Sequence, residues 1–202
     1  MHMDLPLLEL PPEDYGEIPG EAACRKLWKR CNMLPNVARH SLVVARFARA
    51  MAERAAELGK GDASELTMAA GLLHDIAKSY TVRYGGSHAQ LGASWVMTHL
   101  GNPLIARAVL HHVWWPWPFP ENLTSPVFFV LYADKRVMHD RVVSRKTRYL
   151  DLLERYGTNA AAREAIMAGN AHADELERAM AAHLEMDLHE CTLAGRRLVE
   201  RA

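Results

Sequence analysis

The residues of this sequence that are best suited to carry out chemistry are histidines and aspartates at the ends of apolar helical stretches. The heptapeptide LLHDIAK, residues 72–78, places His74 beside Asp75 at the inner end of an apolar run. Two titratable side chains are costly to bury in such a place unless something binds them. His40 lies four residues before Val44, so it shares the apolar stripe of its own predicted helix and faces the same interior.

Three later stretches are expected to add polar side chains on this inner side. They are SHAQLGA with His88, PLIARAVLHH with His111 or His112, and VFFVLYADKRV with Asp134. One histidine on an apolar face is usually a satisfied core residue, but a set of this size would repel or stay desolvated without a cation. Imidazole and carboxylate ligands suit Mn, Fe, Co, Ni or Zn, with Mg as a further option. The sequence therefore predicts a site for one or two divalent metals.

The elements that must position these residues are predicted to be helices separated by turn signals, with no convincing alternating strand. Asn36 is expected to cap one helix, and the pairs Asp62 with Glu65 and Ser87 with Gln90 resemble capping boxes for two others. The pattern predicts an all-α protein, with helices at 21–33, 37–59, 63–77, 88–100, 103–112, 126–139 and 145–156.

Three regions are expected along the chain. Residues 1–33 form an N-terminal arm and helix, residues 34–157 form the core of the bundle, and residues 158–202 form a helical extension packed on that core. The extension is alanine-rich and amphipathic, so we expect two helices with a break near Asp187.

The ordered set His40, His74-Asp75 and Asp134 resembles the H…HD…D pattern of the HD-domain metal-dependent phosphohydrolase superfamily. The resemblance covers about residues 34–157 and extends to the local wording LPNVARHSLVVA, AAGLLHDIAK, SHAQLGA and LYADKRV. The small bacterial HDIG-type proteins are the most similar branch. The resemblance implies an HD-domain helical bundle, in agreement with the helix pattern.

The resemblance also implies a first metal with four ligands, namely His40, His74, Asp75 and Asp134. In binuclear members, histidines equivalent to His88 and His111 bind a second metal and Asp75 bridges the two, which suits a carboxylate because it has two oxygens. His112 is a rival for His111. Residues 76–79 lack the glutamate that several mononuclear relatives carry there. This departure favours a binuclear centre, with a metal separation of roughly 3.5–4 Å.

The implied function is metal-dependent phosphohydrolysis. A metal-activated hydroxide would attack a phosphomonoester, phosphodiester or phosphoanhydride of a nucleotide or related phosphoester. Asp75 and Lys78 are the expected catalytic residues, since Lys78 falls three residues later on the same helical side, within reach of a phosphate oxygen. His112, Lys135 and Arg145 are further candidates for binding substrate. The plainer interpretation of the basic residues is a solvated helix end or face.

Two other functions stay open. One is a regulatory HD protein that binds a nucleotide without hydrolysing it, and the retained ligand set with Lys78 disfavours this. The other is a mixed-valent di-iron HD oxygenase, which iron content and oxygen consumption would separate from a hydrolase.

An aromatic loop, VWWPWPFPENLTS, follows the histidine pair, and its prolines exclude a regular helix. Trp115 and Trp117 could form a wall that stacks a nucleobase, because flat rings stack on bases at little entropic cost. Packing of the loop on its own bundle or on a second subunit is the alternative. Both remain open from the sequence.

Composition limits the partners and the compartment. The 202 residues carry 24 basic and 24 acidic side chains, and this zero net charge predicts no stable nucleic-acid binding and no membrane-binding field. Three cysteines without a CxxC spacing, and a start with no secretory pattern, favour a cytoplasmic location. The expected partner is a small-molecule phosphoester, and a homodimer is left open.

Overall fold

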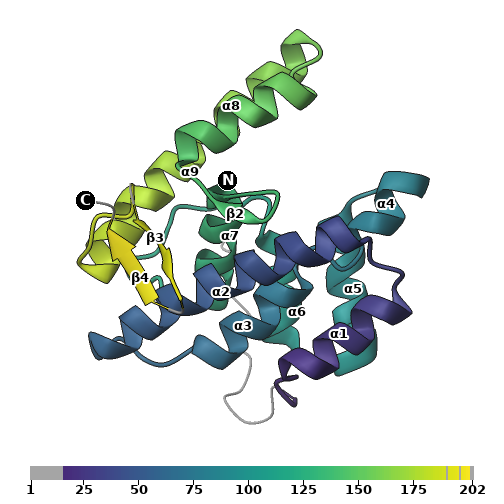
Figure 1. Cartoon of the computed structure of the whole chain (residues 1–202), viewed down its shortest axis with the longest axis horizontal. Helices are drawn as coiled ribbons and strands as arrows, with labels where there is room; N and C mark the ends of the chain where they lie inside the picture. Colours follow the sequence, from purple (N-terminus) through teal and green to yellow (C-terminus); the bar gives the residue numbers. More distant parts are fainter. Residues whose placement is uncertain (1–15, 190, 196, 201–202) are drawn as a thin grey trace, which may run out of the picture.

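The computed structural model describes residues 16–189, 191–195 and 197–200. The predicted arm therefore lies mostly outside the described residues. Figure 1 shows a bundle of helices, two small hairpins, and a helix pair, α8 with α9, that extends away from the rest. The all-α prediction is confirmed. In chain order the elements are α1 (Glu21–Arg30), α2 (Pro35–Glu57), α3 (Ser64–Leu73), α4 (Lys78–Tyr84), α5 (His88–Leu100), α6 (Pro103–His111), α7 (Pro126–Arg136), β1 (Val137–Met138), β2 (Arg141–Val142), α8 (Arg145–Tyr156), α9 (Ala160–Leu184), β3 (Cys191–Ala194) and β4 (Arg197–Glu200).

Helices α2 and α3 approach each other closely because a glycine lies between them. A Cβ atom at Gly71 would lie 2.5 Å from the Cα atom of Ala45 on α2, so only glycine permits this approach. Gly71 comes three residues before His74, and His40 is on α2. The close packing brings the rings of these two histidines to a centroid distance of 5.4 Å.

Helix starts follow local capping chemistry in part. The predicted box at Ser87 is half formed, since its Oγ accepts from the backbone of Gln90 at 3.4 Å. Asn36 does not cap α2, which begins one residue earlier at Pro35. No capping box forms at Asp62, because α3 begins at Ser64 and Glu65 instead pairs with an arginine of α2.

The HD pair lies in a turn and not within a helix. The prediction of a helix to residue 77 is wrong, because α3 ends at Leu73 and residues 74–77 are turns before α4. Ile76 and Ala77 are buried all the same, with exposed fractions of 1% and 0%, and this explains why apolar spacing suggested a continuous helix. Because His74 and Asp75 lie at a turn between two helices, both side chains can point into the centre of the bundle.

A tight hairpin replaces the predicted last turn of α7. The helix ends at Arg136, and β1 pairs with β2 in antiparallel register, Val137 opposite Val142. His139 at the tip adopts a left-handed φ of 56°. Its carbonyl oxygen lies 3.0 Å from Nδ1 of His40, so the hairpin orients a predicted metal ligand.

The C-terminal extension differs from the prediction of two helices broken near Asp187. One helix, α9, runs to Leu184, and the antiparallel pair β3–β4 follows. Arg136 fixes this extension to α7: its side chain is 1% exposed and donates to the carbonyl of Leu188 and, at 2.9 Å, to that of Cys191. The alanine-rich pattern identified the helix, but the strands are too short to show a recognisable alternation of apolar and polar residues.

None of the helices in the part of the chain that the structure describes combines the length and apolarity needed to cross a bilayer. The 25-residue α9 is long enough but carries charged residues along its length, among them Arg163, Asp174 and Glu177.

Candidate metal centre

The bundle brings six histidine and aspartate side chains to one place, and we call this set the metal centre: His40, His74, Asp75, His88, His112 and Asp134. They come from α2, the turn after α3, the first residue of α5, the residue after α6, and α7. Five of them are buried, and His88 has a side chain that is 27% exposed. Two overlapping triads place their ligand atoms within 4.8 Å of one another, His40 with His74 and Asp134, and His74 with Asp75 and His112.

One half of the centre is built around Asp134. Its Oδ1 lies 3.1 Å from Nε2 of His40 and 3.8 Å from Nε2 of His74. Nε2 of His74 is also 3.4 Å from Oδ2 of Asp75. These four residues are those that the family resemblance implied as ligands of a first metal.

The other half is built around the second oxygen of Asp75. Oδ1 lies 3.4 Å from Nε2 of His88 and 3.6 Å from Nε2 of His112. The two Nε2 atoms of these histidines are 3.1 Å apart. The carboxylate of Asp75 therefore turns one oxygen towards each half, as a bridging ligand would.

Backbone carbonyls hold three of the imidazole rings by their outer nitrogens. Nδ1 lies 3.0 Å from the oxygen of His139 in His40, 2.8 Å from that of Gly71 in His74, and 2.6 Å from that of Val109 in His112. A carbonyl only accepts, so each Nδ1 carries a proton, and Nε2 is the nitrogen that each ring turns inward. Metal-ligating histidines show this arrangement in proteins generally.

Two buried atoms in the middle of the centre have no hydrogen-bond partner, namely Nε2 of His74 and Oδ1 of Asp75. Their residues are 0% and 1% exposed, so water does not satisfy them from the surface. Buried polar atoms without a partner are costly and call for an explanation. A divalent metal fits both atoms, because imidazole nitrogen and carboxylate oxygen are its common ligands.

Electrostatics favour the metal-binding protonation states of Asp75 and His88. His74 differs, because burial lowers its pKa but the carboxylates of Asp75 and Asp134 outweigh burial and raise it. Burial would raise the pKa of Asp75, but His74, His112 and Lys78 outweigh it and hold that pKa well below its usual value. Burial and the neighbouring His112 lower the pKa of His88 to about 4. The aspartate is therefore charged and this imidazole neutral near pH 7, and both states favour coordination.

Two lysines lie on the carboxylates, and their predicted role in binding a phosphate oxygen stays a prediction. Nζ of Lys78 is 2.7 Å from Oδ2 of Asp75, and Nζ of Lys135 is 3.1 Å from Oδ2 of Asp134. Arg145 is different: it pairs with Asp174 and bonds to Asn170, both on α9. Residues of α9 therefore hold part of its guanidinium, and the role of Arg145 in binding substrate stays a prediction.

His111, the predicted second-metal ligand, points away from the centre. Its ring lies against Trp115 and Trp117, with centroids 5.1 and 5.5 Å away, while His112 is 1% exposed beside Asp75. Successive helical residues point about 100° apart, so only one of the two histidines can face inward. The geometry corrects the assignment to the rival, His112. The sequence did contain a signal for His112, because it follows the buried Ala108 by four residues and therefore shares its face of the helix.

The aromatic loop packs mainly on the protein itself. Trp115 is 6% exposed, lies 5.0 Å from the ring of Phe128, and donates to the carbonyl of Pro118 at 3.2 Å. Trp114 stacks on His172 of α9 at 4.0 Å. Burial contradicts the prediction that Trp115 offers a face to a base. Trp117 is 48% exposed, so a stacking role there stays a prediction.

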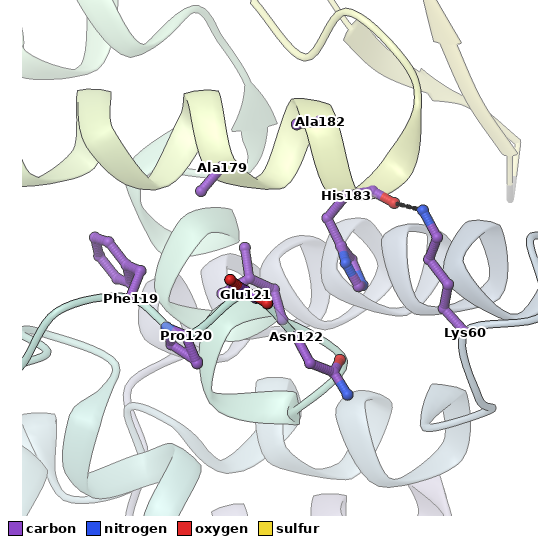
Figure 2. A pocket seen from close by; sticks show the side chains of 9 residues that line it. Lys60, Phe119, Pro120, Glu121, Asn122, Ala179, Ala182 and His183 are labelled. Atoms are coloured by element: carbon purple, nitrogen blue, oxygen red, sulfur yellow. Dashed lines mark hydrogen bonds between the residues drawn. The ribbon is translucent and has the colours of Figure 1, made fainter.

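A surface groove lies elsewhere on the molecule, between α9 and residues 119–123 (Figure 2). Ala179 and Ala182 of α9 face Phe119 and Pro120 of the loop across it, and Lys60 closes one end through a 2.5 Å bond to the carbonyl of His183. No residue of the metal centre lines this groove. It is therefore separate from the candidate site.

Comparison with known proteins identifies similar sequences over the same region. The family model described as "HD domain" matches residues 37–138. Ribonuclease Y of Sulfurovum sp. is 40% identical over 87 residues, which are 43% of this chain and 16% of that protein. Ribonuclease Y of Campylobacter hominis is 38% identical over 110 residues, 54% of this chain and 19% of that protein. The chain thus spans less than a fifth of these relatives. No solved structure matches significantly.

Proposed function

The chain belongs to the HD domain family, whose model covers half of its residues, and from this premise we propose that it is a metal-dependent phosphohydrolase. The observation that carries the proposal is the convergence on one carboxylate, Asp75, of buried Nε2 atoms from two sides, together with a lysine. The unpartnered atoms of His74 and Asp75 support a role in metal binding rather than in packing.

The proposed ligands divide into two sets that share Asp75. His40, His74 and Asp134 would hold the first metal with Oδ2 of Asp75, and His88 with His112 would hold the second with Oδ1. Divalent metals in such a site activate water as a nucleophile at neutral pH and neutralise charge on phosphoryl oxygens. The carbonyl bonds at Nδ1 keep the rings in the orientation and tautomer that this requires.

The proposed role of Lys78 is to bind a phosphoryl oxygen of the substrate. Its Nζ lies on Asp75, and its side chain is 37% exposed, so one end of it reaches the surface. Lys135 is 14% exposed and lies on Asp134, which favours holding that carboxylate in place. Both lysines add positive charge where a phosphate would enter.

The substrate proposed is a nucleotide or a related phosphoester. The matched relatives are named as ribonucleases, which supports hydrolysis of a phosphodiester, although this chain corresponds to less than a fifth of each. The zero net charge predicted no stable nucleic-acid binding, whereas the matched relatives are named as ribonucleases. A short RNA should therefore be tested beside mononucleotides.

The test is a substrate panel with purified protein, in which Mn, Co, Ni and Mg are supplied in turn to nucleotides, a plain phosphodiester and a short RNA. We expect metal-dependent release of phosphate or nucleotide, abolished in Asp75→Asn and retained in His111→Gln. Hydrolysis that survives in Asp75→Asn would contradict the proposal. Oxygen consumption with bound iron, without hydrolysis of any member of the panel, would favour the oxygenase alternative.

A further inference from the structure

The three imidazole rings held by backbone carbonyls differ in where the carbonyl comes from. His74 and His112 each bond through Nδ1 to a carbonyl three residues earlier in the chain. His40 bonds instead to the carbonyl of His139, which is 99 residues away in the sequence. The orientation of His40 therefore depends on the tertiary structure, whereas the other two rings are oriented by the helix ends that carry them.

His139 presents its carbonyl through a backbone conformation that is costly for its residue type. It lies at the tip of the β1–β2 hairpin with a φ of 56°, and its side chain is exposed. The other described non-glycine residues with a positive φ, Asn32 and Glu185, follow the last turn of a helix, where a left-handed residue is common. In a hairpin turn this φ is usually left to glycine, asparagine or aspartate. Such conformations cluster at functional sites, so the tip of the hairpin calls for a role.

Arg136 closes the base of the same hairpin. Its backbone carbonyl accepts from the N–H of Val143 at 2.7 Å, and its Nε donates to the carbonyl of Val143 at 2.7 Å. The hairpin also packs against α2, the helix that carries His40. Contacts with Arg136 and with α2 therefore determine where the carbonyl of His139 lies.

The other end of the Arg136 guanidinium is bound by the C-terminal extension. Nη1 donates to the carbonyl of Leu188, and Nη2 donates to that of Cys191 at 2.9 Å. Nη1 also donates to the hydroxyl of Tyr132 at 2.6 Å, and this hydroxyl donates to Glu177 of α9 at 2.6 Å. One buried side chain thus joins the extension to the hairpin.

We propose that Arg136 and His139 are positioning residues for His40, so that the C-terminal extension sets the affinity of the first metal site. This inference rests on the proposed function for the presence of a metal, and it adds a role for the extension. The second site should not depend on this link, because the bonds of His88 and His112 in the described part of the chain go to Asp75, to each other and to their own helix end.

The first experiment measures Mn affinity by competition with a chelator in His112→Gln protein, which keeps the first set of ligands. His139→Val places a β-branched residue at a positive φ, so the tip should move and its carbonyl should leave His40. We expect Mn to bind about 10–100-fold more weakly, the usual cost of losing a partner of a metal-binding histidine. His139→Gly keeps the carbonyl and adopts this φ freely, so it should bind Mn as the parent does. Arg141→Val, at an exposed and extended position of the same hairpin, is the matched control and should also bind as the parent does.

The second experiment tests the link to the extension. Arg136→Lys keeps the charge, but one ammonium cannot donate to Val143 and to the extension as the guanidinium does, so Mn affinity should fall several-fold. Arg54 is the matched control, because it donates from α2 to the extension at the carbonyl of Leu184, 3.2 Å away. Arg54→Lys should leave Mn affinity unchanged. The free energy of unfolding of each metal-free variant is measured beside it, so that a loss of stability is recorded separately.

The outcomes separate this inference from the proposed function. Equal Mn affinity in His139→Val and His139→Gly overturns the inference, whether or not the protein hydrolyses a substrate. An equal loss at the second site, measured in Asp134→Ala protein, does so too, because it indicates a general loss of structure. Should His139→Val not fold, parental affinity in Arg136→Lys overturns the inference instead. A loss confined to the first site, in a protein that hydrolyses nothing in the panel, supports the positioning role and refutes the phosphohydrolase. A wild-type protein that binds no Mn overturns both.

Discussion

The adjacent residues His111 and His112 belong to two regions of the molecule, and these regions differ in how many of their buried groups already have partners within the protein. His112 enters the metal centre, where buried atoms of His74 and Asp75 have no partner. His111 joins what we call the aromatic cluster, with Trp115, Trp117 and Phe128, whose rings pack on one another. The sequence marked both regions as candidates for chemistry.

The comparison shows that an unsatisfied group is a better guide to function than a concentration of reactive-looking residues. The aromatic cluster is stabilised by its own contacts, and the indole nitrogen of Trp115 already has a partner. The metal centre leaves two buried atoms without a hydrogen bond, Nε2 of His74 and Oδ1 of Asp75, and a bound cation would satisfy both. Substitutions in the two regions should therefore affect different properties.

The largest effect is expected at Asp75, which both halves of the centre share. Asp75→Ala should remove both metals, while Asp134→Ala should mainly weaken the first. The loss of affinity should exceed the roughly 10–100-fold typical of an outer-shell partner, because a direct ligand is removed. Elemental analysis of the purified variants measures it, and two tightly bound equivalents in Asp75→Ala would refute the bridging role.

The adjacent histidines allow a matched test of the comparison itself. His112→Gln should lose the second metal and activity, and His111→Gln should keep both, because only the first of these removes an inward-facing Nε2. Metal content and hydrolysis are measured side by side. The opposite result, with metal lost in His111→Gln alone, would return the assignment to the residue that the family resemblance first indicated.

The aromatic cluster should respond in stability rather than in metal binding. Trp115→Ala removes a buried ring and should lower the free energy of unfolding by about 3–5 kcal/mol. Trp117→Ala changes a half-exposed ring and should cost about 1 kcal/mol or less. Chemical denaturation measures both, with metal content as the control. A loss of metal without a loss of stability in Trp115→Ala would break the distinction between the two regions.

A further effect, confined to acid pH, is expected in the chelator-treated protein. The pKa of His88 is lowered to about 4 by burial and by His112, while an unfolded histidine titrates near 6.5. Between these values the unfolded state binds a proton that the folded state does not, so the free energy of unfolding falls as the pH falls. His88→Gln should lose less stability over this range, by up to about 1.4 kcal/mol per pH unit. Identical pH profiles would contradict a neutral, partly buried His88.

Local signals in the sequence predicted the helix starts well where one side chain is sufficient. Ser87 accepts a bond from the first turn of the helix that follows, as predicted, and Asn102 and Ser144 do the same for their helices. The turn at the HD pair was missed because its apolar residues keep helical spacing while the backbone does not. The strands at residues 191–194 and 197–200 were missed because each has only four residues, too few to show an alternation of apolar and polar side chains.

The sequence identified most of the candidate centre because helical periodicity directs a side chain to one face. His40 and Asp134 could be placed by spacing from apolar neighbours alone. The choice between His111 and His112 needed the tertiary structure, because both lie near the boundary of the buried face.

The central claim is that Asp75 joins two metals, and a crystal structure of the Mn-loaded protein with anomalous scattering tests it most directly. The account predicts two manganese peaks roughly 3.5–4 Å apart. Oδ2 of Asp75 should coordinate the ion held by the first set of ligands, and Oδ1 the ion held by His88 and His112. A single ion at full metal loading, with His88 turned to solvent, would contradict the binuclear centre.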